Sequence, residues 1–226
     1  MGHEIELIAL NRGHNIIAKI DNQQEWNDYI DDIKKAEVAI EFSLPATAVN
    51  NINKCFDISI PIVCGTTGWY QHLDSVKTRC EQEKQTLFYA PNFSIGMNFV
   101  FQLNKQLAAF SQKYNYQEVI TETHHIHKID KPSGTAIKLA EEVIAENNNY
   151  DKWQLDAAYK DNILQINAIR EGECFGIHEI KAFSDYDEIL LRHKAFNRKG
   201  LANGAVIAAE FIKNKKGCFT MNDLLH

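Results

Sequence analysis

Short apolar runs alternate with segments of helical periodicity over the first 95 residues, and this alternation restricts the fold more than any other feature of the chain. Each run is brief and almost continuously apolar, which is typical of a strand buried on both faces. Parallel strands need crossover connections, and helices usually provide them. The pattern therefore predicts an α/β domain with a doubly wound parallel sheet. The expected strands are 15–20, 37–42, 60–64 and 86–90, and the expected helices are 1–11, 45–54 and 70–84.

The pattern changes after Gly96, where strand-like segments follow one another across turns instead of helices. This order favours an antiparallel or mixed sheet, so we expect a second domain of the α+β class. We predict that residues 1–95 and 201–226 form the first domain and residues 96–200 the second. The expected strands after Gly96 are 116–123, 162–170, 176–183 and 188–194, and the expected helices are 97–110, 133–146 and 200–213.

The composition is that of an ordinary soluble globular protein, with 226 residues, 45% of them hydrophobic and 24% charged. The formal net charge is −6, and the sequence pI is about 5.8. This balance argues against a nucleic-acid partner, because such binding needs a broad basic face. It leaves room for a pocket that binds a small anion.

Five scattered cysteines form no C-x-x-C pair and no Cys/His ligand spacing. A structural zinc site is therefore not expected, and reduced thiols in the cytoplasm are the simplest interpretation. No run reaches the ~18 apolar residues of a membrane span, and the N-terminus lacks the pattern of a signal peptide. We predict a cytoplasmic protein that does not interact with a membrane.

The stretch 122–136 carries the most chemical information, since it leaves a predicted strand, crosses a loop and enters a predicted helix. Ser133 is a good N-cap candidate, and Gly134 would let a ligand approach the backbone closely. The first N–H groups of the helix, with the hydroxyl of Thr135, favour an anion such as a carboxylate. Lys128 and the histidines at 124, 125 and 127 would add positive charge and proton donors near neutral pH.

Each part of this stretch also has a purely structural interpretation. A Pro-Ser-Gly-Thr helix start is usually only a cap, and three histidines can form a solvated loop or a metal site. His124 and His125 point to opposite faces of a strand, so they do not easily share a metal. His125 and His127 could, but no third ligand stands at a suggestive spacing, and we predict no metal. The conjunction of proton donors, a cation and an anion-binding helix start favours a functional site.

Loops at the carboxyl ends of the predicted parallel strands are further candidates, because open α/β sheets bind ligands there. The turn Gly65-Thr66-Thr67-Gly68 follows the third strand, and Ala90-Pro91-Asn92-Phe93 follows the fourth. Asp21 ends the first predicted strand and is the type of residue that hydrogen-bonds an adenosine ribose. Each alone is more often a simple turn.

Together these stretches resemble the dihydrodipicolinate reductase family, whose members are also called 4-hydroxy-tetrahydrodipicolinate reductases. The likeness runs across the whole chain. Its most specific part is His124-His125-Ile126-His127-Lys128 with Pro132-Ser133-Gly134-Thr135-Ala136. Supporting matches are Gly65-Thr66-Thr67-Gly68, Ala90-Pro91-Asn92-Phe93-Ser94, and Arg170-Glu171-Gly172 with Gly176 and His178.

The resemblance implies hydride transfer from a nicotinamide cofactor to C4 of an unsaturated dicarboxylate ring, with loss of the 4-hydroxyl as water. It implies His124 as the acid/base group and Lys128 as the proton donor. His125 would contact the substrate, and Gly134 and Thr135 would bind a ring carboxylate. Cofactor-binding residues implied by position are Gly2, Asp21, Gly65, Thr66, Thr67, Ala90, Pro91, Asn92 and Phe93. A Rossmann-like cofactor domain and a central domain that assembles homotetramers through its sheet are also implied.

The N-terminus departs from the family pattern, in which a strand and a glycine-rich turn precede the first helix. Met1-Gly2 resembles only the last two residues of that turn. We hypothesise that the natural protein has roughly ten more residues, which at about 3.3 Å per residue form one strand and a turn. The genomic sequence upstream of Met1 tests this hypothesis.

Two other functions remain open at this stage. A relative that lacks activity and serves as a binding subunit is favoured by the missing turn and opposed by the His124/Lys128 pair. Another nicotinamide-dependent reductase, acting on a different carboxylated imine, is separated from the family activity by substrate assays. For the cofactor, Asp21 followed by Asn22 predicts that NADH is preferred over NADPH, because the carboxylate repels a 2′-phosphate.

Overall fold

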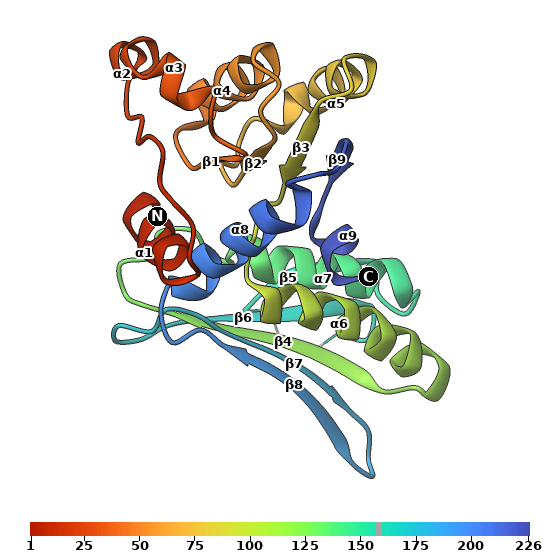
Figure 1. The fold of residues 1–226 in the computed structure, drawn as a ribbon. Coiled ribbons are helices and arrows are strands. Elements are labelled where there is room, and N and C mark those ends of the chain that lie inside the picture. Colours follow the sequence, from red (N-terminus) through yellow and green to blue (C-terminus); the bar gives the residue numbers. More distant parts are fainter. Residues whose placement is uncertain (157–159) are drawn as a thin grey trace. The chain divides into compact units, whose positions relative to one another are not determined.

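The computed structural model describes residues 1–156 and 160–226, which divide into two compact units. Unit 1 comprises Met1–Ile95 and Arg198–His226, and unit 2 comprises Gly96–Asn197. Figure 1 labels the elements of both units along the chain. Within the described residues, no helix is long and apolar enough to cross a membrane.

Unit 1 is built on a parallel sheet whose strands follow the order β1-β2-β3-β9. Neighbouring residues of one strand face opposite sides, so Val63 and Phe88 pack with α1 and α8, whereas Ile62 and Leu87 pack with α4 and α5. Helices therefore cover both faces, which confirms the expected doubly wound α/β arrangement. The strands are β1 (Ala39–Glu41), β2 (Ile62–Cys64), β3 (Thr86–Tyr89) and β9 (Gly217–Phe219). The helices are α1 (Gly2–Asn11), α2 (Gln23–Asp28), α3 (Ile30–Ile33), α4 (Pro45–Asp57), η1 (Tyr70–His72), α5 (Leu73–Gln82), α8 (Lys199–Ile212) and α9 (Met221–Leu225).

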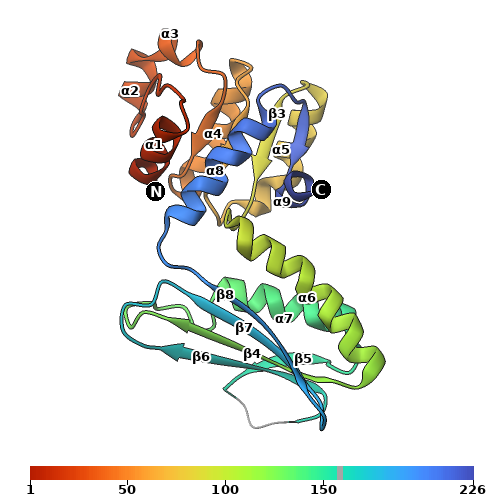
Figure 2. The same cartoon turned by 60° about the horizontal axis from the view of Figure 1, so that its bottom comes forward.

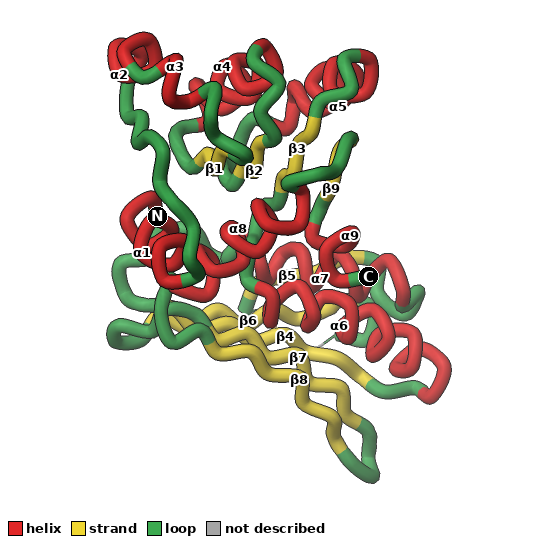
Figure 3. Tube along the Cα trace, viewed as in Figure 1, coloured by secondary structure: helices red, strands yellow, loops and turns green. Residues whose placement is uncertain are grey.

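The strand expected at 15–20 is wrong. This segment is a loop between α1 and α2 (Figure 3), and the described strands of unit 1 form a sheet that ends at β1. Ile16 and Ile17 are 37% and 46% exposed. An apolar run becomes a strand only when a neighbouring strand pairs with its backbone N–H and C=O groups, and no described strand pairs with this one.

Unit 2 is built on a mixed sheet with the order β5-β6-β4-β7-β8. Strands β5, β6 and β4 run parallel to one another, β7 runs antiparallel to β4, and β8 runs antiparallel to β7. The expectation of a mixed sheet after Gly96 is confirmed. Two helices cover one face of this sheet (Figure 2), where Ile120, Leu164, Ile166 and Ile180 are completely buried. The strands are β4 (Gln117–His124), β5 (Lys152–Leu155), β6 (Ile163–Arg170), β7 (Ile177–Phe183) and β8 (Glu188–Lys194), and the helices are α6 (Ile95–Tyr114) and α7 (Gly134–Glu146).

Glu118 lies on this covered face of β4, where it is 5% exposed and accepts a hydrogen bond from Asn147 at 3.0 Å. Burial raises the pKa of Glu118 to about 7, although the bond from Asn147 opposes this shift. The folded state therefore holds a proton on Glu118 at pH values where the unfolded state has lost it. The contribution of Glu118 to the free energy of unfolding is fully present below about pH 4.5, and it is lost as the pH rises to about 7.

We expect Glu118→Gln to be more stable than the wild type at pH 8, by about 3 kcal/mol at most, and equally stable at pH 4.5. The glutamine keeps an acceptor for Asn147 and carries no charge to bury. Urea unfolding at several pH values measures the difference. A constant difference between the two proteins across this range would contradict the assignment.

Candidate active site

A row of polar side chains lies where the apolar core of unit 2 ends, at the carboxyl end of β4. Glu122 and His124 follow Ile120 at every second residue, so all three face the covered side of the sheet. The strand register adds two more groups to the row. His178 of β7 lies opposite Glu122, and Arg170 of β6 lies opposite His124. Side chains that are far apart in the sequence therefore meet at one place.

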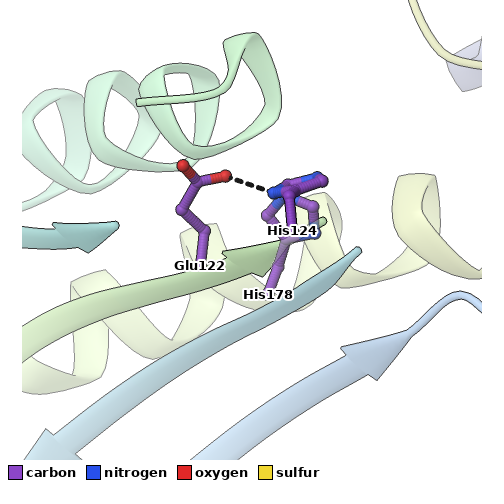
Figure 4. A group of neighbouring side chains, drawn as sticks. All are labelled: Glu122, His124 and His178. Atoms are coloured by element: carbon purple, nitrogen blue, oxygen red, sulfur yellow. Dashed lines mark ion pairs between the residues drawn. The ribbon is translucent and has the colours of Figure 1, made fainter. Parts of the chain in front are cut away.

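Glu122 is the centre of this row and is completely buried. Its Oε1 accepts hydrogen bonds from Arg170 Nη2 at 2.9 Å and from the Ser133 N–H at 3.2 Å. Its Oε2 lies 2.7 Å from His124 Nδ1, and Figure 4 shows this ion pair. The contact is an ion pair when the His124 ring is protonated. Burial would raise the pKa of Glu122, but the contacts with His124, Ser133 and Arg170 outweigh it and hold the pKa at about 2.

His124 and His178 form an edge-to-face ring pair with 5.1 Å between centroids. Burial lowers the pKa of His178 to about 3, and the positive charge of His124 acts in the same direction. His178 is therefore neutral near pH 7. Its Nε2 lies 3.3 Å from Ser133 Oγ, which connects this ring to the start of α7.

Gly176 leaves room for the free edge of His124. A Cβ atom built on Gly176 would lie 3.0 Å from His124 Nε2, and the φ angle of +149° is one that other residues rarely adopt. With the anionic Glu122 beside Nδ1, the ring favours a proton on Nδ1 and leaves Nε2 to exchange a proton with a ligand. This is the arrangement of a general acid/base.

Glu122, His124 and His178 each offer one atom that could bind a metal, and these three atoms lie within 4.8 Å of one another. The surrounding charges argue against a cation there. Both carboxylate oxygens of Glu122 already contact cationic or N–H groups, and Arg170 carries a permanent positive charge beside them. A divalent cation would have to displace these groups and bear the repulsion of Arg170.

The loop after β4 holds the remaining candidates. Lys128 Nζ donates to both oxygens of Asp130, at 2.7 and 2.8 Å. Arg170 donates to the backbone oxygens of Lys128 and Asp130, at 3.3 and 2.6 Å, and so fastens the loop to the sheet. The ring of His125 lies beside that of His127, with 6.0 Å between centroids, and not in the buried row.

The start of α7 is the place where the sequence predicts an anion-binding element. Ser133 is its N-cap, and its Oγ accepts from the Ala136 N–H at 3.2 Å. This confirms the predicted cap. The first N–H groups of a helix have no intrahelical acceptor, so those of Gly134 and Thr135 are available to a ligand. A Cβ atom built on Gly134 would meet no atom within 4 Å, which shows that the space above the backbone is open.

In unit 1, a pocket of about 340 Å³ lies at the carboxyl ends of β1 and β2. Trp69 is completely buried and donates from Nε1 to the Thr66 oxygen at 2.8 Å, so it fixes the turn after β2. The Ser43 N–H donates to Thr66 Oγ1 at 2.8 Å and ties the two loops together. The pocket lies at the edge where open α/β sheets bind dinucleotides. Its lining residues are Met1, Phe42, Ser43, Pro45, Gly65, Thr66 and Thr67.

The other cofactor candidates of unit 1 do not line this pocket. Gly2 is the first residue of α1, and Asp21 is an exposed loop residue whose N–H donates to Glu25 Oε2 at 2.6 Å. Ala90 and Phe93 are 2% exposed and pack in the core beneath α8. Pro91 and Asn92 stand between them in the same loop.

A larger pocket, of about 400 Å³, lies in unit 2 and includes Thr123 and Ile177. These residues alternate with His124 and His178 along β4 and β7, so this pocket lies on the opposite face of the sheet. It is separate from the buried polar row.

Three members of that row, Glu122, Arg170 and His178, were not assigned a role from the sequence. The spacing of Glu122 and His124 was a usable signal, because residues two apart on a strand share a face. Arg170 and His178 come next to them only through the register of β6 and β7.

The fold defines a class, the two-domain α/β proteins whose parallel sheet is of the dinucleotide-binding type. Comparisons with known proteins specify it further. Residues 1–93 match the family model "Dihydrodipicolinate reductase, N-terminus", and residues 96–225 match "Dihydrodipicolinate reductase, C-terminus". The chain belongs to the dihydrodipicolinate reductase family.

Curated relatives agree with this assignment. The chain is 44% identical to the 4-hydroxy-tetrahydrodipicolinate reductase of Christiangramia forsetii, over 100% of this chain and 93% of that protein. It is 35% identical to the reductase of the same name from Bdellovibrio bacteriovorus, over 100% and 91%. The dipicolinate-bound dihydrodipicolinate reductase of Paenisporosarcina sp. TG-14 shares the fold, with a TM-score of 0.79 at 22% identity, over 98% and 94%.

Proposed function

We propose that the chain reduces 4-hydroxy-tetrahydrodipicolinate to tetrahydrodipicolinate with NAD(P)H, a step of lysine biosynthesis through diaminopimelate. The observation that carries this proposal is the buried Glu122–His124 ion pair in the strand that leads to the Ser133 cap of α7. Membership in the reductase family supports it. A dicarboxylate substrate suits a site that combines a proton donor with an anion-binding helix start.

In this proposal His124 is the acid/base group and Lys128 is the proton donor. His125 contacts the substrate, and the backbone and hydroxyl groups of Gly134 and Thr135 bind a ring carboxylate. The Asp130 carboxylate orients Lys128 before the substrate arrives. When bound, the nicotinamide cofactor supplies hydride to C4 of the ring, and the 4-hydroxyl leaves as water.

Residues 1–95 and 201–226 are proposed to bind the dinucleotide, and residues 96–200 to bind substrate and assemble the oligomer. Gly65, Thr66 and Thr67 would hold the nicotinamide side, and they line the pocket of unit 1. Ala90, Pro91, Asn92 and Phe93 would complete that side. Gly2 would face the pyrophosphate and Asp21 the adenosine ribose.

The activity is tested by following NADH oxidation with 4-hydroxy-tetrahydrodipicolinate generated enzymatically. Turnover with this substrate, and none with simple keto acids, supports the proposal. Turnover only with another carboxylated imine would replace the substrate. If NADH fluorescence did not change up to millimolar NADH, the chain would be a non-catalytic relative.

We expect NADH to be preferred over NADPH, because the Asp21 carboxylate repels a 2′-phosphate and accepts from a ribose hydroxyl. Asp21→Asn removes the charge, so it should raise the NADPH to NADH ratio of kcat/KM by up to about fivefold, as suits an exposed charge. Asp28→Asn, on an exposed acidic residue of α2, is the control. A wild-type preference of more than tenfold for NADPH would contradict the assignment.

A homotetramer in the cytoplasm completes the proposal. The face of the unit 2 sheet that α6 and α7 leave uncovered would supply the interface, through residues such as Thr121, Asn167 and Glu179. Light scattering measures the mass in solution, and the mass of a monomer would exclude the tetramer.

A further inference from the structure

We infer that Glu122 and Arg170 are positioning residues that hold the two proton-transferring groups, His124 and Lys128, in one fixed arrangement. This inference deepens the proposed function and rests on it. Neither Glu122 nor Arg170 has to touch the substrate for this role, since each acts through its partners.

Glu122 acts on His124 by charge and by contact. Its Oε2 lies 2.7 Å from Nδ1, and the carboxylate is completely buried, so water screens the attraction very little. An ionised carboxylate at this position attracts positive charge on the ring, and the contact restricts how the ring can move. His124 Nε2 lies beside Gly176, where a Cβ atom would come within 3.0 Å of it.

Arg170 connects Glu122 to the loop that carries Lys128. Its Nη2 donates both to Glu122 Oε1 at 2.9 Å and to the Asp130 oxygen at 2.6 Å, and its Nε donates to the Lys128 oxygen at 3.3 Å. The guanidinium is planar and presents its donors in a fixed fork, which a lysine does not reproduce. The Arg170 side chain therefore holds in place both the Glu122 carboxylate, which contacts His124, and the backbone of the loop that carries Lys128.

The structure offers a matched control for this pair. Glu118 lies four residues before Glu122 on the same face of β4 and is also buried, but it contacts Asn147 and not His124. Glu118→Gln and Glu122→Gln therefore make the same chemical change on the same strand face. Only the second removes a charge from His124.

We expect Glu122→Gln to lower kcat by about 10- to 100-fold while KM changes less than about threefold. The alkaline limb of the kcat/KM profile should move to lower pH, because the ring loses the counter-charge that lies 2.7 Å from Nδ1. Glu118→Gln should leave kcat and the limb where they are in the wild type. The charged or titratable groups around His124 are Glu122 on its own strand, Arg170 opposite it on β6 and His178 on β7. His178 in turn is influenced by Lys128 of the loop and by His193 of β8.

Arg170→Lys keeps the positive charge but loses the planar guanidinium with its several donors. It therefore tests the positioning role of Arg170. We expect kcat to fall about tenfold with a smaller shift of the pH limb than in Glu122→Gln. Wild-type kcat in both variants, with an unmoved limb, would overturn the inference. A loss of kcat that Glu118→Gln shares would identify a merely structural role.

An NMR titration separates this inference from the proposed activity. The ring Cε1–H signal of His124, assigned by its loss in His124→Asn, is followed against pH in the free protein. Glu122→Gln should move the midpoint of the titration to lower pH, and Glu118→Gln should not. This result holds even if the protein turns over a different imine, whereas an unmoved midpoint overturns the role of Glu122 whatever the substrate.

Discussion

His124→Asn is expected to lower kcat by about 100- to 10,000-fold, the range typical of losing a general acid/base. Asparagine retains a polar side chain but transfers no proton. The cofactor pocket of unit 1 is not altered, so NADH affinity measured by fluorescence should stay within about twofold of the wild type. Stopped-flow and steady-state assays with 4-hydroxy-tetrahydrodipicolinate measure the loss.

Two control measurements exclude unfolding and unspecific effects of the substitution as causes of the lost activity. The replacement leaves the buried carboxylate of Glu122 with one partner fewer, so thermal unfolding must show that the variant is folded at the assay temperature. His72→Asn, at an exposed histidine of η1, makes the same change away from the site and should retain full activity. A His124→Asn enzyme that keeps a tenth of the wild-type kcat would remove His124 from the chemistry.

Gly204→Ala is expected to destabilise the protein by about 3 kcal/mol or more, the second large effect. A Cβ atom on Gly204 would lie 1.7 Å from the backbone oxygen of Phe93 and 2.8 Å from its carbonyl carbon. Because the obstacle is backbone and not a flexible side chain, α8 or the Ala90–Phe93 loop must move away from the core of unit 1.

The same helix contains the control. A Cβ atom on Gly200 would meet no atom within 4 Å, so Gly200→Ala should be neutral or should stabilise by up to about 1 kcal/mol. Urea unfolding compares the two variants, and NADH titration shows whether a shift of the loop after β3 changes cofactor binding. Equal stability of the two variants would contradict the close contact between Gly204 of α8 and the backbone of Phe93.

Much of the fold follows from local patterns. Periodicity predicts most strands and the helices near 1–11, 45–54 and 97–110. The apolar residues that form the buried face recur about every 3.6 residues in a helix and every 2 residues in a strand. The two short strands β5 and β9 were missed, since three or four residues hold too little pattern. The 15–20 run has a strand's composition, yet strand formation depends on a partner that its own residues do not specify.

The stretch 122–136 shows the same division. By itself the sequence determined the residue types, the Ser133 cap and the alternation that puts Glu122 on the face of His124, because these depend on neighbours a few residues away. Only the tertiary structure decided that Arg170 and His178 join them, since the register of β6 and β7 sets which residues lie opposite. It also decided the electrostatics, because close contacts hold the pKa of Glu122 at about 2 against the opposing effect of burial, whereas burial lowers the pKa of His178 to about 3.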